Sequence, residues 1–345
     1  MFEHALHARP RLEHGYCTDD VARALLVVMR EPSRTPELER LGATCLSFLV
    51  RAQLPDGRFH NRLSATPERR WLDEVGSDDS NGRALWGLGT AVALATTQEM
   101  RRRALSCFEA GAGLSSPWPR TNAYAVLGAV EALAAHPRRA RARKLLETAA
   151  ARLGSVQPDP DWPWPEARLA YDNARLAEAR IAAGVALRDQ GLVGEGVRLL
   201  DWLVDVETRG DRFSFTPIGG WALGEPRPGF DQQPIEAGSM ADACARAFDA
   251  TGEPRWADAA LRAAAWFLGE NDAAVPLLDP ATGGCRDGLG PEGCNGNQGA
   301  ESTLALIAAL QQARRLQAAA RSALTASAAS TLAAPTQRSA APNVR

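Results

Sequence analysis

Two pairs of adjacent acids stand at the starts of apolar helical patterns in the first quarter of the chain. Asp19 and Asp20 precede the pattern in "GYCTDDVARALLVV", and Asp78 and Asp79 precede the pattern in "GSDDSNGRALWGLG". One acid suffices to cap a helix start, so the second acid of each pair is available for other work. Two carboxylates placed together can act as acid and base, or as acid and nucleophile, at a glycosidic bond.

Arginines follow these acids at helical spacing, so internal ion pairs are the structural alternative. Arg23 comes four residues after Asp19 and three after Asp20, and Arg83 comes four residues after Asp79. Residues at these spacings share one face of a helix. We expect one acid of each pair to cap the helix or bind an arginine and the other to face a cleft. The sequence leaves open which acid does which.

The same opening, a polar loop followed by an apolar helix of small residues, occurs six times along the chain. The openings are rich in acids, amides and aromatic rings, which together suit a sugar site: polar groups bind hydroxyls and rings stack on apolar sugar faces. The tryptophans could equally pack within rigid loops instead of stacking on a ligand. The candidate catalytic residues are Asp20, Asp79, Glu166, Asp172 and Glu236. The candidate substrate-binding residues are His14, Tyr16, Asp19, Asp78, Trp118, Asn122, Trp164, Asn173, Gln232, Gln233 and Glu301.

Helices must position these residues, because the chain reads as helical almost throughout. Six apolar helices alternate with five amphipathic, charged ones, and each pair is a hairpin too apolar to stand alone. This predicts an all-α fold, an (α/α)6 toroid, as a single domain over residues 1–316. An open solenoid is the competing architecture. The missing sixth outer helix is either the Ala-rich segment "LQAAARSALTASAASTL" or absent, and residues 317–345 form a tail, partly helical and then disordered.

Composition excludes several classes of protein. The 345 residues carry a net charge of −2 and no long basic run, which argues against nucleic acid, and no apolar stretch is long enough to cross a membrane. The first residues lack a secretory signal, so we expect a cytoplasmic protein with six reduced cysteines. The pair in "CRDGLGPEGC" lacks further ligands, and no nucleotide-binding motif follows a strand. We therefore expect neither metal nor cofactor.

Three segments carry a resemblance to a known family. "EHGYCTDDVARAL", "LAYDNARLAEA" and "FDQQPIEA" resemble a bacterial family of carbohydrate-associated proteins within the six-hairpin glycosidase superfamily. Its members are often encoded near glycosyltransferases or fused to them, which implies a glycosyltransferase as a possible partner. The resemblance also implies a common pocket, faced by His14, Tyr16, Asp19, Asp20, Asp172, Asn173, Gln232, Gln233 and Glu236.

A second related group, the N-acylglucosamine 2-epimerase-like enzymes, is expected to use histidines of late inner helices as acid and base. All five histidines of this chain lie in its first half, which argues against an epimerase of that type. The sequence therefore favours a glycoside hydrolase acting on a neutral glycan or oligosaccharide. A non-catalytic sugar-binding or partner module for a glycosyltransferase is the alternative, and a helical scaffold whose acids are all caps is the third.

Overall fold

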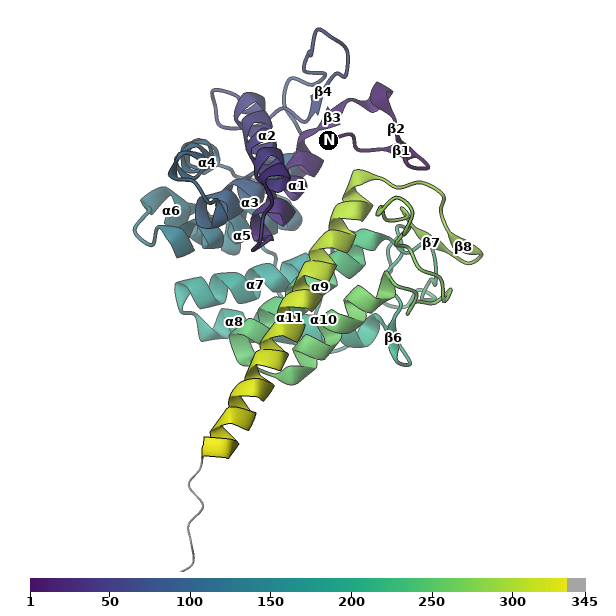
Figure 1. Cartoon of the computed structure of the whole chain (residues 1–345). Helices are drawn as coiled ribbons and strands as arrows, with labels where there is room; N and C mark the ends of the chain where they lie inside the picture. Colours follow the sequence, from purple (N-terminus) through teal and green to yellow (C-terminus); the bar gives the residue numbers. More distant parts are fainter. Residues whose placement is uncertain (334–345) are drawn as a thin grey trace, which may run out of the picture.

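Eleven α-helices make up more than half of residues 1–333, the part of the chain that the computed structural model describes. They alternate along the chain between an inner and an outer position (Figure 1). The inner helices are α1 (Thr18–Arg30), α3 (Asp78–Leu94), α5 (Pro119–Ala135), α7 (Ala174–Leu187), α9 (Pro234–Thr251) and α11 (Ala300–Ala333). The outer helices are α2 (Pro36–Ala52), α4 (Gln98–Gly111), α6 (Ala140–Ala150), α8 (Gln190–Val206) and α10 (Pro254–Trp266).

The inner helices form a closed ring. Each contacts the next inner helix along the chain, and α11 returns to contact α1. Each outer helix packs on the inner helix that precedes it, so the ring has two concentric layers. The predicted (α/α)6 toroid is thereby confirmed, and so is the count of five outer helices within the described residues.

Residue size explains how close the inner helices come. A Cβ atom on Gly89 of α3 would lie 2.1 Å from the carbonyl oxygen of Gly128 on α5. One on Gly128 would lie 2.4 Å from the carbonyl oxygen of Leu85. Only glycine permits this approach, which brings the two backbones into direct contact. The outer helices are amphipathic instead: α2 buries Leu46 and Leu49 completely.

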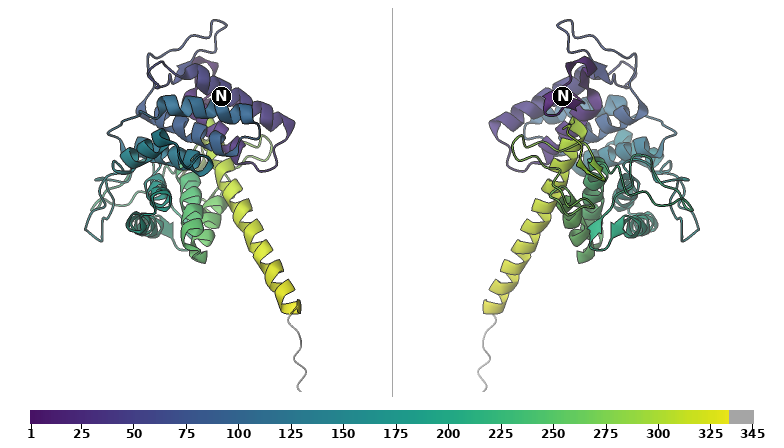
Figure 2. Two further views of the ribbon diagram at one scale, coloured as in Figure 1. Left: turned by 90° about the vertical axis from the view of Figure 1, so that its left-hand side faces the viewer. Right: turned by 90° about the vertical axis from the view of Figure 1, so that its right-hand side faces the viewer.

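The Ala-rich segment at the end of the chain does not form a sixth outer helix. It continues α11, which runs without interruption from Ala300 to Ala333 and projects beyond the ring (Figures 1 and 2). On the outside of the α1–α11 contact lies an apolar groove of about 490 Å³, lined among others by Val27, Leu41 and Ile307. The predicted disordered end, residues 334–345, lies outside the described residues.

Short antiparallel strand pairs lie in the loops outside the helices. The pairs are β1 (Ala5–Leu6) with β2 (Arg9–Pro10), β3 (Tyr16–Cys17) with β4 (Arg62–Leu63), β5 (Thr208–Arg209) with β6 (Arg212–Phe213), and β7 (Leu289–Gly290) with β8 (Gly293–Cys294). No helix among the described residues has the length and apolar character needed to cross a membrane.

Candidate functional site

The loops that precede the inner helices meet at one end of the ring. Tyr16 before α1 pairs with Leu63 in the loop before α3. Leu169 before α7 pairs with Trp221 before α9, and Gln232 before α9 pairs with Leu289 before α11. We call this end, formed by the six inner-helix starts and the loops before them, the N-terminal rim.

Two arginines of the inner helices lie at the centre of the rim. Nη1 of Arg23 lies 2.7 Å from Asp20 and 3.3 Å from Asp19. Its Nη2 donates to the hydroxyl of Tyr171 at 3.0 Å and to Glu301 at 2.5 Å. One guanidinium thus joins the start of α1 to the start of α11, across the closure of the ring.

Arg83 makes the corresponding connection to the other side of the rim. Its Nε lies 3.0 Å from Asp19, and its Nη2 lies 3.2 Å from Asp172. Nη2 also donates to the hydroxyls of Tyr124 and Tyr171, at 2.6 Å each. The Tyr171 hydroxyl in turn donates to Glu301 at 2.9 Å. Acids from three different helix starts therefore form one continuous network.

The first acid pair separates into one buried and one partly exposed side chain. Asp20 is fully buried, whereas the Asp19 side chain is 22% exposed. Burial raises the pKa of Asp20 to about 7, against the effect of Arg23 and with a further rise from Asp19. Neither acid caps α1 through its side chain, because Cys17 occupies the N-cap position and makes no side-chain cap bond.

The second acid pair is held by hydroxyl groups. Asp78 accepts a hydrogen bond from Ser116 and Asp79 accepts one from Thr121, both at 2.6 Å. The cap of α3 is Ser77, whose side chain accepts from a backbone N–H. Both acids are half-buried.

Glu236 holds the backbone that carries Asp172. Its carboxylate accepts from the backbone N–H groups of Asp172 and Asn173, at 2.5 and 3.0 Å. Asp172 has a φ of 50°, in the left-handed region that Asp tolerates better than most residues. These two bonds fix that turn at the start of α7.

The electrostatics of this buried pair differ. Burial alone would raise the pKa of the Asp172 carboxyl, but Arg175 and Arg83 outweigh it and hold the pKa below its ordinary value. Burial, with contributions from Glu207 and Asp172, raises the pKa of Glu236 well above its ordinary value. Both side chains are inaccessible to solvent or nearly so. They support the rim from beneath.

Glu166 joins the network through Arg120. Nη1 of Arg120 contacts both carboxylate oxygens of Glu166, at 2.6 and 2.7 Å. Nη2 of Arg120 donates to the amide oxygen of Asn173 at 3.1 Å. The Glu166 side chain is 26% exposed, so this acid also faces solvent at the rim.

The other predicted site residues lie outside this network. Gln232 is buried, accepts a hydrogen bond from Trp266 and donates one to Asp272. Asn122 donates hydrogen bonds to two backbone carbonyls. Trp164 is buried and stacks against Trp202. These three support loops. Four others lie on or near the rim surface: Tyr16 stacked on Phe2, His14 beside His4, a half-buried Gln233, and Trp118, which is 62% exposed.

Six residues of the network were not among the candidate site residues: Arg23, Arg83, Arg120, Tyr124, Tyr171 and Arg175. Helical spacing did predict Arg23 as a partner of Asp19 and Asp20. Spacing along one helix gives no sign that a guanidinium also reaches a neighbouring helix. No group of three or more His, Cys, Asp or Glu side chains within residues 1–333 is arranged to hold a metal ion.

Comparisons with known proteins bear on the fold. No protein-family model matches the sequence, and no curated protein matches it. A sugar epimerase from a ruminal bacterium is similar in structure, with a TM-score of 0.69 and 9% identity over 90% of this chain and 92% of that one. The cellobiose 2-epimerase from Spirochaeta thermophila has a TM-score of 0.66 and 13% identity, covering 92% and 90%.

A third similar structure is a hydrolase. The GH76 alpha-mannanase from Bacteroides thetaiotaomicron has a TM-score of 0.64 and 12% identity, over 89% of this chain and 88% of that one. At these identities the likeness concerns the fold alone. It extends over about nine-tenths of this chain in each of the three structures.

Proposed function

We propose that this protein is a carbohydrate-active enzyme, a glycoside hydrolase that cleaves a neutral glycan or oligosaccharide at the N-terminal rim. The observation that carries the proposal is the arrangement of Asp19 and Glu301, two partly exposed carboxylates bound to the same guanidinium, that of Arg23. The similar structures named for a mannanase and for sugar epimerases add support for a sugar substrate.

The shared guanidinium sets an upper limit on the separation of these two carboxylates. Asp19 lies 3.3 Å from Nη1 of Arg23, and Glu301 lies 2.5 Å from Nη2. Since both bind one guanidinium, the contacting oxygens are no more than about 8 Å apart, compatible with the roughly 5–9.5 Å of glycosidase carboxylate pairs. The five candidate catalytic residues predicted from the sequence did not include Asp19 or Glu301. Three of those five, Asp20, Asp172 and Glu236, are buried below the pair and support it.

The environments of the two carboxylates assign their roles. Asp19 contacts two guanidinium groups, those of Arg23 and Arg83, and so suits the base or nucleophile, which must carry negative charge. Glu301 contacts a single guanidinium, and we assign it to the acid that protonates the leaving oxygen. Glu301 is also the more exposed of the two, at 32% against 22%.

The charge balance of the rim favours an uncharged substrate. The arginines of the network, Arg23, Arg83 and Arg120, are each already bound to at least one carboxylate. An anionic sugar would meet acids rather than free cations. The exposed ring of Trp118, at the start of α5, offers an apolar face on which a pyranose can stack.

A panel of variants tests this assignment. Glycan cleavage is measured for the parent, Asp19→Asn and Glu301→Gln, with Glu147→Gln as the control because Glu147 is an exposed acid on the outer helix α6, away from the rim. Loss of the acid or the base lowers kcat by about 10²–10⁴-fold, whereas the control stays within a few-fold of the parent. If the parent cleaves a glycan and both variants cleave it at the same rate, the assignment is wrong.

Glu166→Gln and Asp79→Asn extend the panel to the other partly exposed acids predicted from the sequence. If one of these substitutions abolishes cleavage while Asp19→Asn does not, the protein is still a hydrolase and the catalytic pair is reassigned.

The six free cysteines are in keeping with our proposal of a cytoplasmic location.

A non-catalytic module that binds sugar and partners a glycosyltransferase is the second candidate. One observation favours it: Asp19, Asp20, Asp172 and Glu301 are all bound to arginine, and a hydrolase needs its acid free to give up a proton. Calorimetric binding of an oligosaccharide with no cleavage of that sugar after prolonged incubation would favour the module. Cleavage of the same sugar would exclude it.

A further inference from the structure

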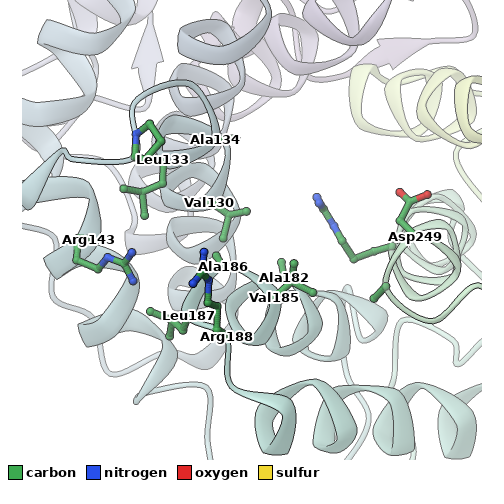
Figure 3. A pocket seen from close by; sticks show the side chains of 13 residues that line it. Val130, Leu133, Ala134, Arg143, Ala182, Val185, Ala186, Leu187, Arg188 and Asp249 are labelled. Carbon is green, nitrogen blue, oxygen red and sulfur yellow. The ribbon is translucent and has the colours of Figure 1, made fainter.

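A second concave site lies at the opposite end of the ring, where α5, α7 and α9 end. It is a pocket of about 590 Å³ whose walls are mainly apolar, and Val130, Leu133, Ala182 and Val185 contribute to them (Figure 3). α7 begins at the N-terminal rim and ends here, and its length of fourteen residues places the pocket about 20 Å from the rim. Neither acid of the proposed catalytic pair lines it.

Two arginines at this pocket lack a partner. The guanidinium groups of Arg143 on α6 and Arg188 after α7 have no hydrogen bond or ion pair within the described part of the chain. Figure 3 shows both of them on one side of the pocket, with Asp249 on the other side. Two like charges beside an apolar surface repel one another, and an anion placed between them would relieve that repulsion.

The other charged side chains of the pocket are already paired. Arg246 lies 3.3 Å from Glu131 and 3.7 Å from Glu178, and Asp249 lies 2.8 Å from Arg315. The unbalanced charge facing the pocket is therefore positive and comes from Arg143 and Arg188. Val185, on the apolar wall, is 54% exposed, so the apolar surface is also open to a ligand.

We propose that this pocket binds a small amphiphile: an apolar body that fills the cavity and a carboxylate, phosphate or sulfonate head that binds Arg143 and Arg188. Guanidinium groups match such heads because their fixed N–H donors can bind two oxygens at once. The cavity volume is typical of sites for drug-sized ligands. The proposal is independent of the rim, so a failed hydrolase assignment leaves it standing.

Two fluorescent probes with the same rings separate the charged and apolar contributions. Anilinonaphthalene sulfonate carries an anionic head, and phenylnaphthylamine lacks it. We expect the full chain to bind one sulfonate probe per monomer, about tenfold or more tightly than the neutral probe, because hydrogen bonds to charged groups are the stronger ones. Decanoate and decyl phosphate should displace the probe, and inorganic phosphate alone should not.

Variants localise the binding. The double variant Arg143→Gln with Arg188→Gln should lower the affinity for the sulfonate probe about tenfold or more and leave the affinity for the neutral probe unchanged. Val185→Gln should lower the affinity for both probes. Arg40→Gln with Arg198→Gln, two exposed arginines elsewhere, makes the same charge change and should alter neither. Equal binding of the two probes by the parent, unaltered sulfonate binding by the pocket double variant, or displacement by inorganic phosphate would each overturn the proposal. So would binding that requires dimerisation, measured by light scattering.

Discussion

Asp20→Asn tests whether burial disfavours the ionised form of Asp20, the buried acid of the first pair. Asp20 is fully buried at the start of α1 and binds Arg23 at 2.7 Å. Burial nevertheless dominates and raises its pKa to about 7 from an ordinary 3.8. Asparagine keeps the shape of the protonated acid and removes the titration, so the variant isolates the pH-dependent part of the contribution to stability.

The sign and size follow from that shift. A carboxyl whose pKa is raised on folding contributes its full stability below its unfolded-state pKa and loses that contribution as pH rises through its folded pKa. At about 1.4 kcal/mol per pKa unit, a shift of about three units amounts to about 4 kcal/mol. The free energy of unfolding of the parent should therefore fall by about 4 kcal/mol between pH 4 and pH 8 on account of Asp20.

Urea unfolding followed by circular dichroism at five pH values from 4 to 8 measures this slope. Subtracting the parent from Asp20→Asn removes the contributions of the other titrating groups, which the two chains share. The difference should rise with pH, in favour of the variant, mostly between pH 4 and 7. A flat or falling difference for Asp20→Asn would refute the reasoning.

Three further substitutions test the supports of the rim and ring by the same unfolding measurement. Glu236→Ala leaves two buried backbone N–H groups without an acceptor and should cost about 2–5 kcal/mol; a cost below 1 kcal/mol would argue against the clamp. Gly89→Ala pushes a methyl against the carbonyl of Gly128 and should cost about 1–3 kcal/mol or more, whereas Gly113→Ala, with open space around it, should cost little. Ser77→Ala removes the cap of α3 and should cost about 1 kcal/mol; an unchanged midpoint would contradict that role.

The architecture was accessible from sequence because it depends on local patterns. Apolar periodicity and repetition identified six inner and five outer helices, and the structure confirms both. The Ala-rich segment was harder to place, since alanine favours a helix without indicating a new one. Nothing between Glu301 and Leu332 breaks the helix, so the segment extends α11.

The candidate site was less accessible because its bonds cross between helices. Sequence spacing predicted that one acid of each pair would bind an arginine or cap its helix, but not that Asp19 would bind Arg83 of the next inner helix. Gln232 and Trp164 have the residue types of a sugar site, yet they lie buried in loop supports. Burial of a polar side chain depends on the packing of distant loops, which no local pattern encodes.

The contact that closes the ring has a consequence for how the molecule reaches its native state. Arg23 and Glu301 are 278 residues apart in sequence, and Gln311 bonds to the carbonyl of Val27 across 284 residues. Contacts of such separation form late, because the intervening chain must first be ordered. During synthesis α11 also emerges after the ten other helices of the ring. The rim network is therefore completed only when the whole chain has folded, and a partly folded chain lacks half of the proposed catalytic pair.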